Sequence, residues 1–353
     1  MRILVINPGG TSTKIAVYED EKLLMSGQVE HTQKDLETYE TVLDQLDMRM
    51  NAMFDALENE QIPLESIDGV SGRGGLLKPI PGGTYAVNEA MLEDVANAIN
   101  GEHPSNLGSA MAKAVGDKLG IPSFVVDPVS VDEFVPEARI TGLEEISKHS
   151  WLHALNQKAV GRKIAGEMGK QYEDVNLIIA HLGSGISVAA HEKGKMIDGS
   201  GARSDGPFSP ERTGGLLTYD LVNLCFSGKY THEELVKKIS TASGFYDYLG
   251  TKDTREVEAR IDAGDEKAQL IWNSFVYQVA KEICLYSGVL FGNVDGVGIT
   301  GGMSHSKRLV EAIRERVEFL APVFVVPGEL EMEALAAGAL RVLSGVEDVK
   351  EYK

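Results

Sequence analysis

The same local pattern occurs twice in this sequence, about half the chain apart. Each copy has an apolar strand, a turn rich in glycine and hydroxyl residues, a second strand, a tight turn and a third strand. The first copy opens with the run 3–6 and its turn begins at Asn7; the second opens with 176–180 and its turn begins at His181, 174 positions later. One such unit in each half is typical of a duplicated protein with two domains and a cleft between them.

The first turn, Asn7-Pro-Gly-Gly-Thr-Ser-Thr-Lys14, has the composition of an anion-binding loop. Glycine lets the backbone approach a ligand, and the hydroxyl groups and Lys14 add hydrogen-bond donors and one positive charge. The segment is neither a Walker loop nor a dinucleotide fingerprint, because the Walker spacing is missing and a strand follows. An ordinary hairpin turn has a similar composition, so the segment alone leaves both interpretations open. The repeat favours phosphate binding.

Composition excludes several classes of partner. The net charge is -19, from 53 acidic and 34 basic residues, which disfavours nucleic acid and anionic membrane surfaces. Two cysteines, Cys225 and Cys284, indicate a reducing compartment without a disulfide framework. The chain starts without a secretory signal, and Lys281 and Glu282 interrupt the longest apolar region, 271–291. A soluble cytoplasmic protein is expected.

Apolar periodicity predicts an α/β chain in which strands alternate with helices. A third glycine-rich turn, Thr300-Gly-Gly302, is expected between a strand and a helix, where nucleotides tend to bind. Helices are expected near 39–60, 88–99, 105–119, 151–168, 215–226, 232–239, 254–262, 265–291, 306–318 and 330–343. Strands are expected at 3–6, 15–18, 22–26, 67–71, 123–126, 176–180, 188–191, 195–197, 294–300 and 323–326.

Five segments in order along the chain resemble those of the acetate and butyrate kinase (acetokinase) family, within the actin, sugar kinase and Hsp70 superfamily. Segment 206–215, Gly-Pro-Phe-Ser-Pro-Glu-Arg-Thr-Gly-Gly, and the chain length are closest to the butyrate kinase branch. The five are 7–14, 72–75, 181–185, 206–215 and 300–302.

The resemblance implies two ribonuclease-H-like (actin-like ATPase) domains with a nucleotide cleft between them. The first domain is expected to comprise 1–150 plus 329–353 and the second 151–328. The implied reaction is reversible phosphoryl transfer from ATP to the carboxylate of butyrate or a branched short-chain fatty acid, directly in line and with Mg²⁺. An acetate or propionate kinase is the alternative, as is a non-catalytic ATP-binding module. A homodimer or higher homo-oligomer is implied.

The resemblance also implies a set of catalytic residues. An ionised carboxylate needs no general base, so catalysis reduces to positioning and to neutralising charge. Arginine suits this task because its planar fork binds carboxylate or phosphate at two points. The family's arginines match Arg73 and Arg212, with Arg203 as the alternative to Arg212. Its phosphoryl-stabilising histidine matches His153. Asp127 is expected to hold a metal-bound water or the histidine, although a turn residue before Pro128 would look alike.

Metal and nucleotide residues follow from the same resemblance. Glu331 and Asn7 are expected at the Mg²⁺, and Glu333 is the alternative to Glu331. The expected nucleotide and phosphate residues are Asn7, Gly10, Thr11, Ser12, Lys14, His181, Gly183, Ser184, Gly185, Gly301 and Gly302. Phe208, Pro207 and Val135 are candidate walls of the acid pocket. The other histidines, His31, His103, His149, His191, His232 and His305, are expected to be surface or capping residues.

Overall fold

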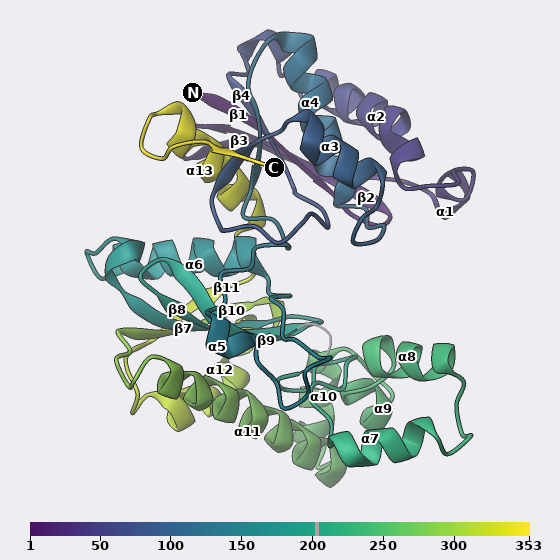
Figure 1. Ribbon diagram of the computed structural model, residues 1–353, viewed down its shortest axis with the longest axis vertical. Coiled ribbons are helices and arrows are strands. Elements are labelled where there is room, and N and C mark those ends of the chain that lie inside the picture. The colour runs from purple at the N-terminus through teal and green to yellow at the C-terminus, as the bar shows by residue number, and fades with distance from the viewer. Residues whose placement is uncertain (202–204) are drawn as a thin grey trace. The chain divides into compact units, whose positions relative to one another are not determined.

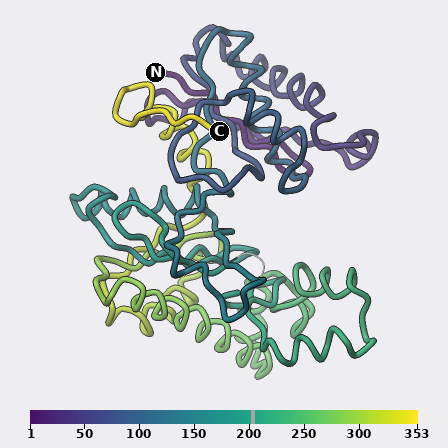
Figure 2. The backbone as a smooth tube through the Cα atoms, in the orientation of Figure 1, coloured from purple at the N-terminus to yellow at the C-terminus, as the bar shows by residue number. Residues whose placement is uncertain are grey.

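The computed structural model describes residues 1–201 and 205–353, which form two units. The first unit comprises Met1–Asp132, Ala154–Asn156 and Leu330–Lys353, and the second comprises Glu133–His153 and Gln157–Glu329. Figure 1 labels their helices and strands, and Figure 2 shows the C-terminal segment ending within the N-terminal unit. The predicted domain boundaries stay a prediction.

The first unit is built on a seven-stranded sheet with the order β12-β5-β6-β4-β1-β2-β3. β1, β2 and β3 form an antiparallel meander, while β4 pairs parallel to β1 and β6 pairs parallel to β4. The strands are β1 (Arg2–Pro8), β2 (Ser12–Glu19), β3 (Lys22–Glu30), β4 (Gly69–Gly72), β5 (Thr84–Ala86), β6 (Ser123–Val126) and β12 (Lys350–Glu351).

Helices cover this sheet on both faces. α2 and α4 share an apolar core with β1 and β2, whereas α13 packs over β1, β4 and β6 and lies on the opposite side of the sheet in Figure 1. The helices are α1 (Gln33–Leu36), α2 (Leu46–Asn59), α3 (Glu89–Ala96), α4 (Asn106–Leu119) and α13 (Glu331–Leu343).

The second unit is built on a five-stranded sheet with the order β11-β10-β7-β8-β9. In Figure 1 α6 lies on one side of this sheet and α11 and α12 on the other. The strands are β7 (Asn176–Leu182), β8 (Ile186–Glu192), β9 (Lys195–Gly201), β10 (Gly296–Gly301) and β11 (Val323–Pro327). The helices are α5 (Pro136–Arg139), α6 (Ala154–Glu167), α7 (Thr218–Cys225), α8 (His232–Thr241), α9 (Phe245–Leu249), α10 (Thr254–Asp262), α11 (Glu266–Val289) and α12 (Lys307–Val317).

The predicted internal repeat is confirmed at the level of strand order. The series β3-β2-β1-β4-β6 in the first sheet corresponds to β9-β8-β7-β10-β11 in the second, with the same parallel and antiparallel pairings. The register shifts at equivalent places, between Val17 and Tyr18 and between Ala190 and His191. Across the first ladder Asn7 pairs with Lys14, and across the second His181 pairs with Ser187.

Several predicted elements differ in extent. The helix expected from about residue 39 begins at Leu46, because 43–45 form a 3-10 turn first. Gly301 and Gly302 lead into a 3-10 helix, Gly302–His305, and α12 begins only at Lys307 with Ser306 as its cap. The short strands β5 and β12 and the short helices α1, α5 and α9 were not predicted, since two to five residues carry too little periodicity.

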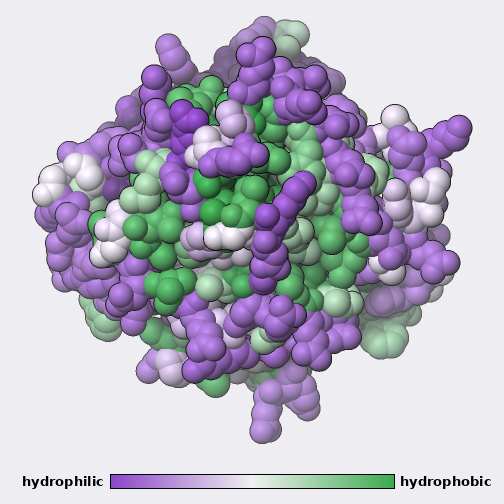
Figure 3. Space-filling model, turned by 90° about the horizontal axis from the view of Figure 1, so that it is seen from above, coloured by the Kyte–Doolittle hydropathy of each residue, from purple (hydrophilic) through white to green (hydrophobic). Residues whose placement is uncertain are grey.

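The surface agrees with the charged composition. In the view of Figure 3 hydrophilic residues form the rim and hydrophobic residues gather near the centre. Within the described residues, no helix has both the length and the apolar character that crossing a bilayer requires.

Candidate functional site: two sets of converging residues

In the first unit three predicted residues meet at one edge of the sheet. β1 and β4 run parallel, so Asn7, near the end of β1, and Arg73, just after β4, lie side by side. The Arg73 guanidinium forms an ion pair with Glu331, the first residue of α13, and Asn7 Nδ2 donates to Glu331 Oε2 at 3.0 Å. Both partners of the ion pair are partly buried, with 27% and 18% of their side chains exposed. A strand end, an arginine and a helix start thus form one polar cluster.

Glu333, the alternative to Glu331, is exposed and lies elsewhere. Burial raises the pKa of the Tyr18 phenol, and the negative charge of Glu333 raises it further. Glu333 therefore lies near Tyr18 of β2, whereas Glu331 contacts Asn7 and Arg73.

Asp127 follows β6 at the same sheet edge, but its carboxylate supports a turn. Its side chain is buried, Oδ1 accepts a hydrogen bond from Gly83 N at 2.7 Å, and its own amide donates to Gly83 O at 3.0 Å. The backbone of Asp127 is left-handed, with φ of 38°. These contacts match the turn alternative for Asp127, and its catalytic role stays a prediction.

A buried arginine, Arg49 of α2, holds the turn between β1 and β2. Nη1 donates to Gly9 O at 2.9 Å and to Ser12 O at 3.1 Å, and Nη2 donates to Gly10 O at 2.9 Å. Nε and Nη2 also donate to Gln45 Oε1, one turn earlier on the helix. Because the turn directs three carbonyl groups at this guanidinium, its shape depends on Arg49. The predicted phosphate residues Gly10, Thr11, Ser12 and Lys14 lie in or beside this turn.

Replacing Arg49 by methionine is expected to lower the free energy of unfolding by about 3 kcal/mol, because three carbonyl groups of the turn lose the charged donor that holds them together. Chemical denaturation measures the change. Arg2→Met is the matched control, since Arg2 forms a surface ion pair with Glu19 and its loss should cost less than about 1 kcal/mol. Equal losses in the two variants would show that Arg49 does not hold the turn.

In the second unit two histidines stack where β7 ends and α6 begins. The rings of His153 and His181 lie 3.9 Å apart with an angle of 12° between their planes. His153 Nδ1 is 2.8 Å from Ser187 Oγ, and His181 Nε2 is 3.6 Å from Glu329 Oε1. His181 is almost fully buried at the end of β7. The stack fixes the plane of His153 beside the turn 183–185.

The predicted arginine of this unit, Arg212, reaches the same turn. A Cβ atom on Gly185 would lie 2.6 Å from Arg212 Nη1 and 3.7 Å from His153 Cε1, so the guanidinium and the imidazole both border Gly185. His153, His181, Gly183, Gly185 and Arg212 therefore form a second cluster. Arg203, the alternative to Arg212, lies outside the described residues.

The loop that carries Arg212 is tied to this turn by Ser209. Ser209 Oγ donates to Ser184 O at 2.6 Å and accepts from Arg212 N at 3.1 Å. Ser209 N also donates to Arg212 O at 3.0 Å, and Ser209 O accepts from Phe245 N at 3.3 Å. Ser209 thus holds the main chain of Arg212 in place. The Arg212 side chain takes no part in these hydrogen bonds.

The third glycine turn, at Gly301 and Gly302, follows β10, and main-chain hydrogen bonds close it; its nucleotide role stays a prediction. Gly301 N donates to Gly328 O at 2.9 Å, and Gly328 N donates back to Gly301 O at 3.2 Å. The amide of Gly301 therefore binds within the protein, whereas Gly302 is exposed and a Cβ atom there would meet nothing within 4 Å.

Comparisons with known proteins show which family the chain belongs to. The family model described as "Acetokinase family" matches residues 146–325, and the chain is 49% identical to butyrate kinase 1 of Clostridium acetobutylicum over all of this chain and 99% of that protein. The chain belongs to the acetokinase family. Its fold matches an acetate kinase from Porphyromonas gingivalis, with a TM-score of 0.79 and 20% identity over 97% of this chain and 99% of that one. A propionate kinase from Francisella tularensis gives a TM-score of 0.73 and 20% identity over 96% and 98%.

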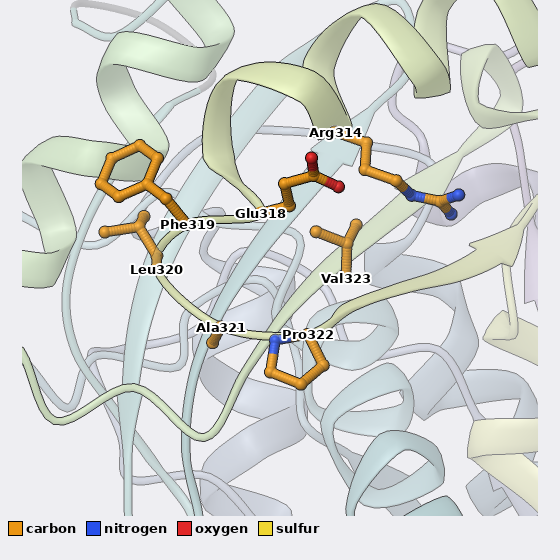
Figure 4. A pocket seen from close by; sticks show the side chains of 7 residues that line it. All are labelled: Arg314, Glu318, Phe319, Leu320, Ala321, Pro322 and Val323. Atoms are coloured by element: carbon orange, nitrogen blue, oxygen red, sulfur yellow. The ribbon is translucent and has the colours of Figure 1, made fainter.

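Two of the hollows on the second unit of this acetokinase differ in their relation to the predicted site. One adjoins the Arg212 loop and is lined by Phe208, Thr213, Gly244 and Tyr248 among others; Phe208 also packs against Phe245 and Phe275 at 5.6 Å. The other, at the passage from α12 to β11, is lined by Arg314 and 318–323, and Figure 4 shows Arg314 and Glu318 extending from the helix end. No predicted site residue lines the second hollow.

Several contact residues of this acetokinase were missed or misread from the sequence. His31 and His191, expected to be surface or capping residues, are buried. Arg49 lies on the apolar stripe of α2, three residues after Leu46 and four before Met53, so its position signalled burial. Ser187 and His191 share one face of β8, and His153 and Gln157 are four residues apart, spacings that pointed to shared contacts.

Proposed function

We propose that this chain transfers the terminal phosphoryl group of ATP to the carboxylate of a short-chain fatty acid, butyrate first of all, giving an acyl phosphate and ADP. The observation that carries the proposal is the 49% identity to butyrate kinase 1 over the full length of both chains. The chemistry of the two clusters is compatible with it, since each presents an arginine beside a polar turn.

The residues divide the work by charge. The acid and the terminal phosphate are both anions, so cationic groups have to offset their repulsion while the carboxylate oxygen attacks phosphorus. Arg212 and Arg73 are assigned to this task, and His153 is assigned to donate a hydrogen bond to the phosphoryl group in transfer. The turns 9–12 and 183–185 are assigned to the phosphate chain of ATP.

Mg²⁺ fits the donor groups of the first cluster. This ion takes one or two carboxylates together with water and substrate phosphates, so one carboxylate suffices. Glu331 with the Asn7 amide is assigned to hold it, and Arg73 balances the charge of Glu331 when the ion is absent. The described residues contain no group of three or more acidic, histidine or cysteine side chains suited to a metal. When bound, the ion neutralises charge on the ATP phosphates.

Three further parts of the proposal concern the whole protein. The domains are 1–150 with 329–353, and 151–328. A homo-oligomer, a homodimer at least, is supported by the exposed apolar side chains of α7 and its flanks, among them Leu217, Tyr219 and Phe226. The protein acts in the cytoplasm, where ATP is available.

The test is an assay of ATP with straight and branched acids of two to six carbons, with hydroxylamine to trap the acyl phosphate. We expect kcat/KM to be highest for butyrate or isobutyrate, because each further buried methylene contributes about 0.8 kcal/mol, or roughly fourfold. A maximum at acetate or propionate would move the assignment to those kinases. ADP formation that does not depend on any acid would contradict a carboxylate kinase. Omitting Mg²⁺ in a parallel series tests the metal assignment.

A further inference from the structure

A continuous chain of hydrogen bonds runs through the second unit from Tyr172, in the short 3-10 helix that follows α6, to His153. Tyr172 Oη lies 2.6 Å from His191 Nδ1, and His191 Nε2 lies 2.8 Å from Gln157 Oε1. Gln157 Nε2 lies 2.8 Å from Ser187 Oγ, which lies 2.8 Å from His153 Nδ1. Tyr172, His191, Gln157 and Ser187 are all buried, so no solvent competes for these bonds.

The direction of the chain is fixed at Gln157. Its Nε2 is also 3.4 Å from the main-chain oxygen of Ser187, which only accepts hydrogen bonds. The NH₂ group therefore faces Ser187, and the amide oxygen faces His191. Because that oxygen accepts, His191 has to carry its proton on Nε2.

His191 is held in the neutral form. Complete burial lowers its pKa well below the usual value, and the positive charge of Lys158 lowers it further. Lys158 is itself buried and anchored to Glu133 at 2.8 Å and to Gly194 O at 2.9 Å, so this charge is fixed in place. A neutral His191 with its proton on Nε2 accepts at Nδ1, and Tyr172 Oη donates to it.

The orientation of Gln157 also determines the hydrogen bond between Ser187 and His153. Ser187 Oγ accepts from Gln157, and its own single proton is then directed to its other partner among the described residues, His153 Nδ1. A ring nitrogen that accepts carries no proton. We propose that Ser187, Gln157, His191 and Tyr172 form a positioning relay that keeps His153 in its neutral form, with the proton on Nε2, so that this nitrogen donates to the phosphoryl group in transfer.

The inference rests on the proposed function, because that function gives His153 its task. The relay adds which proton His153 offers and what keeps it there. The stack on His181 fixes the plane of the ring, and the bond to Ser187 fixes its rotation about the Cβ–Cγ bond. Together they leave one orientation for the Nε2–H bond.

The direct test measures the protonation of His153 in the intact wild-type protein. Imidazole ¹⁵N chemical shifts from protein labelled at histidine distinguish protonated from unprotonated nitrogens, and the spectrum of His153→Gln identifies the signals. At pH 7.5 we expect an unprotonated Nδ1 and a protonated Nε2. A proton on Nδ1, either alone or in a doubly protonated ring, would overturn the proposal. This measurement needs neither activity nor a relay variant.

A variant tests whether the relay matters for turnover. Ser187→Ala should lower kcat by about 10- to 100-fold, the range for groups that orient a first-contact residue, and change KM for ATP and acid less than about twofold. Ser200→Ala is the control, because Ser200 is a buried serine on the neighbouring strand β9 and is not part of the relay. A full kcat in Ser187→Ala, or equal losses in both variants, would count against the relay.

The outcomes separate the relay from the proposed function. A wild-type chain that forms no acyl phosphate with any acid removes the proposed function, while the ¹⁵N spectrum still decides the protonation of His153. An active wild type with the opposite protonation removes the relay alone.

Discussion

Arg212→Ala is expected to lower kcat for acyl phosphate formation by a factor of about 10³ or more, the range known for arginines that stabilise phosphoryl transfer. The guanidinium borders Gly185, and the imidazole of His153 borders the same glycine. The fold should be retained, with a melting temperature within about 2 °C of wild type, because Ser209 and the main chain hold this loop. Steady-state kinetics and thermal unfolding measure the two effects.

Two further variants separate the loss of the Arg212 guanidinium from a general loss of positive charge. Arg212→Lys keeps the charge but loses the planar fork, so an intermediate kcat is expected. Arg255→Ala is the control, because Arg255 is 89% exposed in the same unit and forms an ion pair with Asp253, which also lies at the surface. Unchanged turnover in Arg212→Ala would remove Arg212 from the mechanism and direct attention to Arg203.

Gly244→Ala is expected to destabilise the second unit by more than about 3 kcal/mol and to reduce activity with it. A Cβ atom there would lie 1.7 Å from Ser209 O, and the residue has φ of 62°. Neither the collision nor the backbone conformation can be relieved without moving the segment that holds Arg212. Denaturant unfolding followed by fluorescence, together with kcat, measures the loss.

The matched control lies at the other end of the same helix. Gly250 ends α9 with φ of 77°, but a Cβ atom there meets nothing within 4 Å. Gly250→Ala should therefore cost only the backbone strain, about 1–2 kcal/mol. The difference between the two variants isolates the collision with Ser209. If the two variants lose the same free energy of unfolding, the close approach of Gly244 to Ser209 does not contribute to the stability of the second unit.

The repeat and most of the long elements could be predicted from the sequence, because apolar periodicity is a local property. The strand-turn-strand pattern in both copies of the repeat predicted the two antiparallel meanders. β6 and α10 agree with their predicted bounds. The strands β5 and β12 were missed because each is only a few residues long and is defined by pairing with other strands, β5 with β6 and β12 with β5. The pairing of β12 with β5 joins residues about 265 positions apart, and a local sequence pattern cannot predict such a contact.

The candidate site divides in the same way. Glycine turns and arginines stand out in the sequence, so Asn7, Arg73, His153 and Arg212 could be named. Their contacts could not be predicted, because the ion pair of Arg73 with Glu331 and the hydrogen bond from Ser209, in the Arg212 loop, to Ser184 join segments that are separate in the sequence. Buried polar residues such as Arg49 and His191 were the hardest to predict. Their residue types are usual at the surface, and only their position on an apolar face of a helix or strand indicates burial.

The ladder partners at equivalent places in the two halves have a practical consequence for engineering. Lys14 faces solvent opposite Asn7, whereas Ser187 is buried opposite His181. The contacts of a side chain at this paired position therefore depend on the neighbouring secondary structure and not on the hairpin alone. A hairpin transplanted from one half to the other would keep its hydrogen-bonded ladder and lose its chemistry, so a functional graft has to carry Gln157 and its helix along with Ser187.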